Sequence, residues 1–322
     1  MVLTGVLHVH TRHSDGTGSV EEVIEAAARC GLDFIGINDH RTLAARHEGW
    51  LGMHRGVFVL PGAELEDSRR NCHVLAYGID SLPSTRDTRE QIAAIRETGG
   101  LSIAAHPCER GGHLPGTRSY GWTMPVEGVD GVEVWNYMSM WKAGLTPWNF
   151  RDRVVRPDRM SIHPCGESIR KWFSCGGCAV GGPDAHAIRL GIGRFHTCIF
   201  PYEMLFSRLR MHLVIDSDWD RRDVQGERAI LDSIRAGRCF VSNALLGDAR
   251  GFSARVDGGR LSVSVPGRSE VVVGTASGEI ARIPIEDSAC TEMEVPAGVP
   301  LSVEVRKGEG TWIWCGLPCS SR

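Results

Sequence analysis

The chain has 322 residues, of which 42% are hydrophobic and 23% are charged, and its formal net charge at pH 7 is −3. A chain of this length and ordinary composition can bury one large core and a smaller one. The slight negative charge argues against a protein that coats nucleic acid, and no apolar run is long enough to span a membrane.

From residue 1 to about 245, short apolar runs alternate with stretches of helical periodicity. Ser19 and Glu22 have the spacing of a capping box that opens a helix. Further helices are expected at Leu43–Met53 and Thr85–Thr98. The apolar runs predict strands at Gly5–Val9, Phe34–Ile37, Val57–Pro61, His73–Tyr77, Leu101–Ala105, Gly131–Trp135, Cys178–Gly181 and Thr197–Phe200. Repeated β–α units favour a largely parallel sheet, and this many of them favour its closure into a barrel.

After Asn243 the helical periodicity stops, and short β-rich segments follow at regular spacing, separated by turns such as Asp257-Gly258-Gly259. This pattern predicts a small β-sandwich. We therefore expect a barrel domain over residues 1–245 and an all-β sandwich domain over residues 246–322. Within the barrel, Cys108–Val129 and Gly144–Gly166 are long and Gly/Pro-rich, which is typical of loops that cover a functional site.

The segment before His8 is too short to hold the basic and apolar regions of a secretion signal, so we expect a cytoplasmic protein. Its eleven cysteines then indicate reduced thiols rather than a disulfide framework. Cys175 and Cys178 form a CxxC motif, which alone is a weak signal for zinc. We interpret it as the end of a helix, a Gly turn and the start of a strand.

Histidines and carboxylates near strand ends are the candidates for chemistry. His8-Val9-His10 closes the first predicted strand, and side chains at i and i+2 of a strand point the same way, so both imidazoles can reach one metal ion. Asp184-Ala185-His186 repeats this spacing after another predicted strand. These strand ends lie where the active sites of α/β barrels lie.

At Asp39-His40, adjacent residues face opposite ways, so we expect His40 to bind a metal and Asp39 to orient an imidazole. The full set of candidate ligands is His8, His10, Asp15, His40, Glu64, His73, His106, Asp184 and His186. One catalytic metal takes three or four protein ligands, so nine fit two or three divalent ions that share a carboxylate. The mixture of imidazole and carboxylate suits Zn, Mn or Fe.

These residues closely resemble those of the PHP (polymerase and histidinol phosphatase) family of metal-dependent phosphoesterases. The matching segments occur in the family's order and cover most of residues 1–200. They are Leu7–Gly16, Asn38–His40, Pro61–Leu65, His73–Ile79, Ala104–Pro107, Gly131–Asn136 and Gly181–His186. Asn38 stands where the family usually has Thr, and Pro183 stands where it usually has Ser, but neither is an expected ligand.

The resemblance implies a distorted seven-stranded (β/α) barrel with three metal ions. The first ion would be held by His8, His10, Glu64 and Asp184. The second would share Glu64 and add His73 and His106, and the third would take Asp15, His40 and His186. The strands after Gly237–Asn243 resemble the β domain of the carbaryl-hydrolase-like branch. The branch that acts on nucleotide 5′-phosphates usually has an inserted domain between His73 and His106, where this chain has room only for a helix and a strand.

The implied activity is hydrolysis of a small phosphomonoester or phosphodiester, with a hydroxide that bridges two ions as the nucleophile. Catalytic roles are expected for Asp15, His106, Asp184 and His186. The candidates for binding substrate are Arg12, His13, Arg110, Glu133, Asn136 and Arg194.

Two other functions stay open: hydrolysis of a carboxyl or carbamate ester by the same cluster, and a binding or regulatory module in which the metals are structural. The expected partner is a small-molecule phosphoester, with a nucleotide as one option. No membrane and no stable nucleic-acid complex are expected, and the sequence leaves the oligomeric state open.

Overall fold

The computed structural model describes residues 1–322 except 115–116, 157–159, 161, 193–194, 217–218 and 320–322. None of the helices in that part of the chain is both long and apolar enough to cross a membrane. The helices are α1 (Val20–Arg29), α2 (Ala44–His47), α3 (Thr88–Glu97), α4 (Tyr137–Ala143), α5 (Phe150–Val155), α6 (Gly166–Cys175), α7 (Tyr202–Phe206) and α8 (Asp223–Arg235).

The strands fall into an N-terminal and a C-terminal series. The first series is β1 (Val2–Val9), β2 (Phe34–Ile37), β3 (Gly52–His54), β4 (Val57–Leu65), β5 (Val74–Tyr77), β6 (Leu101–Ala104), β7 (Gly131–Asn136), β8 (Cys178–Gly182), β9 (Arg189–Ile192), β10 (Phe195–Cys198), β11 (Leu209–Val214) and β12 (Cys239–Asn243). The second is β13 (Ser253–Asp257), β14 (Arg260–Val265), β15 (Ser269–Thr275), β16 (Gly278–Ile285), β17 (Ala289–Glu294), β18 (Leu301–Lys307) and β19 (Gly310–Leu317).

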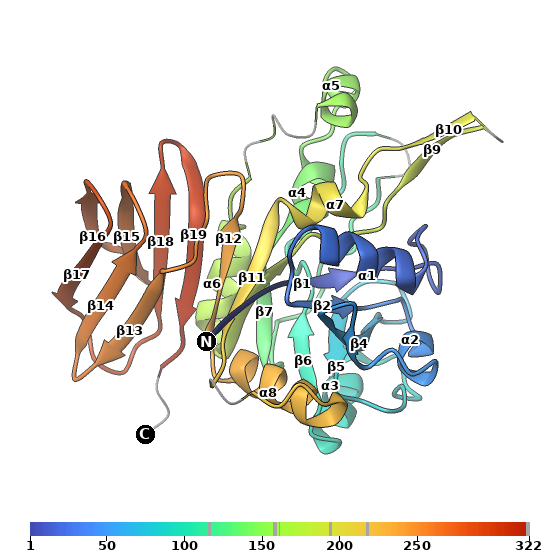
Figure 1. Ribbon diagram of the computed structural model, residues 1–322, viewed down its shortest axis with the longest axis horizontal. Helices are drawn as coiled ribbons and strands as arrows, with labels where there is room; N and C mark the ends of the chain where they lie inside the picture. The colour runs from blue at the N-terminus through green and yellow to red at the C-terminus, as the bar shows by residue number, and fades with distance from the viewer. Residues whose placement is uncertain (115–116, 157–159, 161, 193–194, 217–218, 320–322) are drawn as a thin grey trace.

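One sheet of 14 strands dominates the described residues (Figure 1). Its order is β16-β15-β18-β19-β12-β11-β1-β2-β4-β5-β6-β7-β8, with β3 paired to β4 at the side. The pairs β1–β2, β2–β4, β6–β7 and β7–β8 are parallel. By contrast, β5 is antiparallel to both of its neighbours, and β11 is antiparallel to both β1 and β12.

The sheet curls so that β8 returns to the end of β1. Ala185, just after β8, accepts a backbone hydrogen bond from His10 at 2.9 Å and donates one to His8 at 3.1 Å. The fold is thus mixed α/β, but the exact seven-stranded barrel is not confirmed, because the sheet continues past β1 into β11 and β12. The segment expected as a strand at Thr197–Phe200 belongs in part to an outlying hairpin of β9 and β10.

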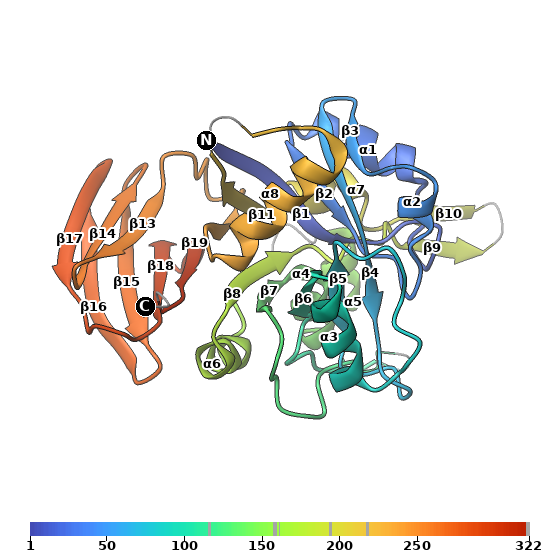
Figure 2. The same cartoon turned by 90° about the horizontal axis from the view of Figure 1, so that it is seen from below.

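The C-terminal strands form two layers, and one of them belongs to the main sheet (Figure 2). β13, β14 and β17 make a separate three-stranded sheet, whereas β15, β16, β18 and β19 continue the large sheet through the pairing of β19 with β12. The two layers share an apolar core in which Val263 of β14 and Val303 of β18 are buried. The buried apolar residues form two clusters, with Phe240 in the C-terminal one and Trp314 in the N-terminal one, while the main sheet runs through both parts.

Local sequence signals explain several element ends. The capping box is confirmed: the Ser19 hydroxyl accepts from the Glu22 amide, and the Glu22 carboxylate accepts from the Ser19 amide at 2.7 Å. The CxxC interpretation is also confirmed, since α6 ends at Cys175, two glycines with positive φ follow, and β8 begins at Cys178. The helix expected at Leu43–Met53 is shorter, because only Ala44–His47 is helical before β3 begins.

Candidate metal centre

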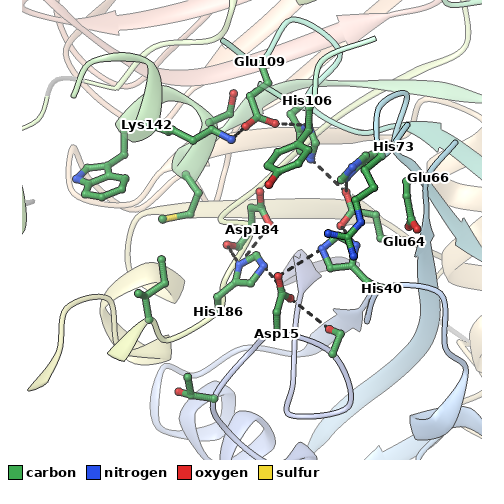
Figure 3. A pocket seen from close by; sticks show the side chains of 18 of the residues that line it. Asp15, His40, Glu64, Glu66, His73, His106, Glu109, Lys142, Asp184 and His186 are labelled. Atoms are coloured by element: carbon green, nitrogen blue, oxygen red, sulfur yellow. Dashed lines mark hydrogen bonds and ion pairs between the residues drawn. The ribbon is translucent and has the colours of Figure 1, made fainter. Parts of the chain in front are cut away.

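The nine candidate ligands from the sequence meet at one edge of the curled sheet. All of them except the buried His8 and His10 are labelled in Figure 3. Most of them lie at the carboxyl ends of strands: His8 and His10 at β1, His40 after β2, Glu64 near the end of β4, His106 after β6, and Asp184 and His186 after β8. His73 instead precedes β5. Because β5 is antiparallel to its neighbours, its amino end lies at the same edge.

Glu64 lies at the centre of the cluster and is 1% exposed. Its Oε2 atom is 3.4 Å from His8 Nε2, 3.2 Å from His10 Nε2 and 3.3 Å from His40 Nδ1. Its Oε1 atom is 2.7 Å from His73 Nδ1 and 3.1 Å from His106 Nε2. The two oxygens thus face two different groups of imidazoles.

Two further carboxylates complete the cluster. Asp184 Oδ1 lies 3.3 Å from the Nε2 atoms of both His8 and His10. Asp15 is more exposed, and its oxygens lie 3.2 Å from His186 Nε2 and 3.6 Å from His40 Nε2. The donor atoms therefore gather into overlapping groups whose members lie within 4.8 Å of one another.

The residues fit divalent metal ions. In the described part of the chain, the Nε2 atom of His73 is buried and makes no hydrogen bond, and the Nε2 atoms of His8 and His10 face the carboxylate oxygens of Glu64 and Asp184 at 3.2–3.4 Å. A buried polar atom without a partner carries a free-energy cost, which coordination to an ion removes. Imidazole and carboxylate are the ligands that Zn, Mn and Fe accept.

The charges of the cluster are strongly coupled. Burial opposes the charge of His10, but hydrogen bonds to Asp184 and Glu64 outweigh it and raise the pKa of His10 to about 9. Burial lowers the pKa of His40 to about 4 in spite of Glu64. Burial also opposes the charge of Glu64, yet the surrounding histidines hold the pKa of this carboxyl well below its ordinary value. The carboxylates are therefore ionised and available to a cation.

Three of the candidate ligands have a left-handed backbone: φ is +64° at His8, +54° at Asp184 and +26° at His106. Such a conformation costs a residue with a Cβ roughly 1–3 kcal/mol and persists only where the surroundings enforce it. In His8 and Asp184 it accompanies the backbone bridge between the ends of β1 and β8. The strain therefore lies where the ligands converge.

Glu133 and Asn136, expected to bind substrate, instead support the ligands. Glu133 Oε1 lies 3.0 Å from His8 Nδ1, and Oε2 accepts from the backbone amide of His106 at 2.8 Å. The Asn136 side chain donates to Glu133 at 2.9 Å and to Asp184 at 3.4 Å. Both residues are buried and hold the candidate ligands from behind.

Asp39 was expected to orient an imidazole, but the structure gives it another role. It accepts hydrogen bonds at 2.7 Å from the amide and hydroxyl of Thr11 and from the hydroxyl of Ser14. It therefore fixes the loop that carries Asp15. Glu109, which the sequence analysis missed, orients an imidazole: its Oε2 lies 2.9 Å from His106 Nδ1.

A cavity of about 760 Å³ opens onto the cluster. Arg12, His13 and Arg110 are not among the described residues that line it; His13 pairs with Glu48 at 3.2 Å, and Arg110 pairs with Glu167. Arg194 lies outside the described residues. Arg12, His13 and Arg110 therefore lie outside the described lining of the cavity, and the prediction for Arg194 stays untested.

Other cations line the cavity instead: Arg70, Lys142 and Arg189. Tyr120, Ser139 and Trp141 also line it, and they come from the loop expected at Cys108–Val129 and from α4. Tyr120, Ser139 and Lys142 carry no local motif, so the sequence offered no signal that would select them.

Comparison with known proteins agrees with this geometry. The family profile of the PHP domain matches residues 7–85. An uncharacterized protein of Methanocaldococcus jannaschii is 32% identical over 143 residues, which are 40% of this chain and 80% of that protein. The chain belongs to the PHP family. The matched residues include the candidate ligands His8, His10, Asp15, His40, Glu64 and His73.

Another relative of this PHP protein is a phosphoribosyl 1,2-cyclic phosphate 1,2-diphosphodiesterase of Eggerthella lenta, 36% identical over 81 residues. That match spans 23% of this chain and only 30% of the Eggerthella enzyme. A solved two-domain protein of Bacteroides vulgatus, described as containing a predicted PHP-like metal-dependent phosphoesterase, superposes with a TM-score of 0.50 at 13% identity. It covers 95% of this chain and 90% of its own length, so the likeness extends over the whole fold.

Proposed function

We propose that this PHP protein is a metal-dependent phosphoesterase that cleaves a small phosphomonoester or phosphodiester. The observation that carries the proposal is the convergence of nine imidazole and carboxylate side chains, with Glu64 at their centre in contact with five of the imidazoles. The names of its PHP relatives support the same reaction class.

We further propose three ions, with Glu64 shared between the first two. His8, His10, Glu64 and Asp184 would hold the first, His73 and His106 would join Glu64 at the second, and Asp15, His40 and His186 would hold the third. The contacts within each group support this division. We retain residues 1–245 as the catalytic part and residues 246–322 as a β-sandwich domain, which the two separate cores support.

The cavity favours a phosphoester over a neutral ester. Arg70, Lys142 and Arg189 line the same space as the candidate ligands. Arginine and lysine side chains contribute positive charge where a phosphoryl group carries its negative charge, whereas a carbamate has no such charge to neutralise. A carboxyl ester therefore explains these cations less well.

When bound, divalent ions would neutralise phosphoryl oxygens and lower the pKa of water at the site. The protein contributes orientation. Glu133 fixes His8, Glu109 fixes His106 and Asn136 contacts Asp184, so these three candidate ligands are held from behind before a substrate arrives. Arg70, Lys142 and Arg189 would then orient the anionic part of the substrate.

The test begins with the metal content of protein purified without chelator. Phosphate release from monoesters, diesters and cyclic nucleotides would then be measured with Mn, Zn or Fe, beside a panel of carboxyl and carbamate esters. We expect two to three metal equivalents and turnover of phosphoesters only. Fewer than two equivalents with no turnover would contradict the proposal, and turnover of carboxyl esters alone would replace it.

Two variants link the activity to the cluster. Asp184→Ala and His106→Ala are expected to lower phosphoester hydrolysis by about 100-fold or more, since even the residues behind metal ligands contribute 10–100-fold. Asp257→Ala and His54→Ala, which change residues away from the cavity, serve as matched controls. Unchanged hydrolysis in the first two variants would show that the activity comes from elsewhere.

A further inference from the structure

Lys142 is the cation in the cavity whose position is most closely defined. It lies near the end of α4, which follows β7 directly. Asn136 caps this helix by accepting from the Ser139 amide at 2.7 Å, and the same side chain donates to Asp184 at 3.4 Å. One residue thus ties the start of α4 to a candidate metal ligand, and this sets where Lys142 enters the cavity.

The Lys142 ammonium faces the cluster through Glu109. Its Nζ atom pairs with one Glu109 oxygen, while the other oxygen lies 2.9 Å from His106 Nδ1. Nζ also lies 4.6 Å from the centre of the Tyr120 ring, and the side chain is 18% exposed. Figure 3 shows Lys142 and Glu109 on the same side of the pocket as His106, away from His40. Glu109 and Tyr120 therefore hold the Lys142 ammonium in place, and the protein partly shields it from solvent.

Phosphoester cleavage leaves an alkoxide that needs a proton. Arginines keep their protons in proteins, so Arg70 and Arg189 cannot supply one. Asp15, Glu64 and Asp184 are candidate ligands, and Glu109 is occupied by His106 and Lys142. Among the described ionisable groups of the cavity that are not candidate ligands, Lys142, Tyr120 and Glu66 remain as proton donors. Glu66 lies near Arg86 at 3.4 Å, whereas Lys142 adjoins both Tyr120 and the Glu109 side chain that contacts His106.

Resting on the phosphoesterase function proposed above, we infer that Lys142 protonates the leaving oxygen. Oxygen from water forms a bond to phosphorus, the bond from phosphorus to the leaving oxygen breaks, and its electron pair takes a proton from the Lys142 ammonium. The attacking water loses a proton to solvent, and the Lys142 amine takes up a proton from solvent. The sum is one ester and one water converted to one alcohol and one phosphate.

The environment of Lys142 agrees with this role. Burial outweighs the charges of Asp184 and Glu64 and lowers the pKa of Lys142 to about 8. Near neutral pH such a lysine is still mainly protonated, and it gives up its proton more readily than an exposed lysine.

The test compares leaving groups. Lys142→Met is assayed on phosphoesters of p-nitrophenol, phenol and an aliphatic alcohol, in order of rising leaving-group pKa. We expect kcat to fall by about 100-fold or more on the aliphatic ester, the range of general acid catalysis, and by less than about 5-fold on the p-nitrophenyl ester, whose leaving group needs no proton. Lys142→Arg is expected to behave like Lys142→Met, because a guanidinium keeps its proton.

Lys171→Met on α6, outside the cavity, is the matched control, and the melting temperature and metal content of all variants are compared with those of the wild type. A second readout uses the metal-free protein. The rate at which Lys142 reacts with an amine-selective reagent, followed by mass spectrometry, should have its pH midpoint near 8 and below that of Lys171.

Several results would overturn the inference while leaving the proposed function intact. One is an equal loss of kcat on all three esters in Lys142→Met, and another is recovery of kcat in Lys142→Arg. A third is a leaving-group effect in Glu66→Gln but not in Lys142→Met. The last is a pH midpoint for modification of Lys142 that is no lower than that of Lys171. If the wild-type protein cleaves none of the phosphoesters, the proposed function fails and this inference fails with it.

Discussion

Glu133 Oε1 lies 3.0 Å from His8 Nδ1, while the other oxygen of Glu133 accepts the backbone N–H of His106 at 2.8 Å. One buried carboxylate therefore orients a candidate ligand of the first ion and the backbone of a candidate ligand of the second. A glutamine cannot accept at both positions.

We predict that Glu133→Gln lowers metal affinity by about 10–100-fold, the range found for residues behind metal ligands. Metal content after dialysis against a weak chelator measures this, with the exposed Glu97→Gln of α3 as the control. Equal metal retention by Glu133→Gln and the wild type would show that Glu133 is not needed to hold the ions.

Asp15 is the most exposed of the candidate ligands, with 59% of its side chain accessible, and it contacts His40 and His186 rather than Glu64. We predict that Asp15→Asn removes one metal equivalent and leaves the others in place, because the remaining carboxylates do not depend on it. Elemental analysis counts the equivalents, with Asp220→Asn as a control. Loss of every metal, or of none, would argue against a separate third site.

Metal binding should release protons. In the metal-free protein, hydrogen bonds to Asp184 and Glu64 outweigh burial and raise the pKa of His10 to about 9. At pH 7 an ion must therefore displace the proton from His10, so affinity should rise with pH up to about 9 and level off above it.

Calorimetric titration with Zn or Mn in two buffers of different ionisation enthalpy counts the released protons. We expect at least one proton per protein at pH 7 and fewer at pH 9.5. A count that does not change with pH would contradict the protonated state of His10.

His212 of β11 gives the protein an acid sensitivity away from the metal centre. It is buried between Thr4 and Ser242, and burial lowers its pKa to about 4. The unfolded chain, with a histidine pKa near 6.5, binds the proton more readily between these values. Stability is therefore full above pH 6.5 and falls as the pH drops towards 4, by roughly 3 kcal/mol at most from this residue.

Urea unfolding at pH 7, 5.5 and 4.5 measures this loss. His212→Gln is expected to be less stable at pH 7 but to lose less stability on acidification than the wild type. Because the other titrating groups are common to both proteins, the difference between the two pH slopes isolates His212. Parallel slopes would contradict the prediction.

The sequence placed the candidate ligands together because most of them are tied to a strand end by their neighbours in the chain. The alternation of a strand predicts that His8 and His10 point the same way, although the left-handed backbone at His8 departs from a regular strand in the structure. His73 was selected because it adjoins a predicted strand, although it precedes that strand. The pattern of apolar residues in β5 does not reveal that this strand runs antiparallel to its neighbours.

The residues that sequence reasoning missed depend on contacts between distant segments. Lys142 pairs with Glu109 at the cavity, and the spacing of the two residues along the chain does not predict that contact. Arg110 shows the opposite case: it is near His106 in sequence, yet it turns outward to Glu167. The shared sheet was also invisible, because the pairing of Val241 with Trp314 joins strands more than seventy residues apart.

That pairing has a mechanical consequence. β12 and β19 are neighbours in one hydrogen-bonded sheet, and the ring of Trp314 packs edge-on against that of Trp172 with their centroids 5.5 Å apart. The C-terminal strands are therefore joined rigidly to the N-terminal part of the chain. This strand pairing restricts rotation of the C-terminal strands relative to the N-terminal part. Spin-label distances between the two parts should therefore be narrowly distributed, and they should stay the same when metal is added or withdrawn.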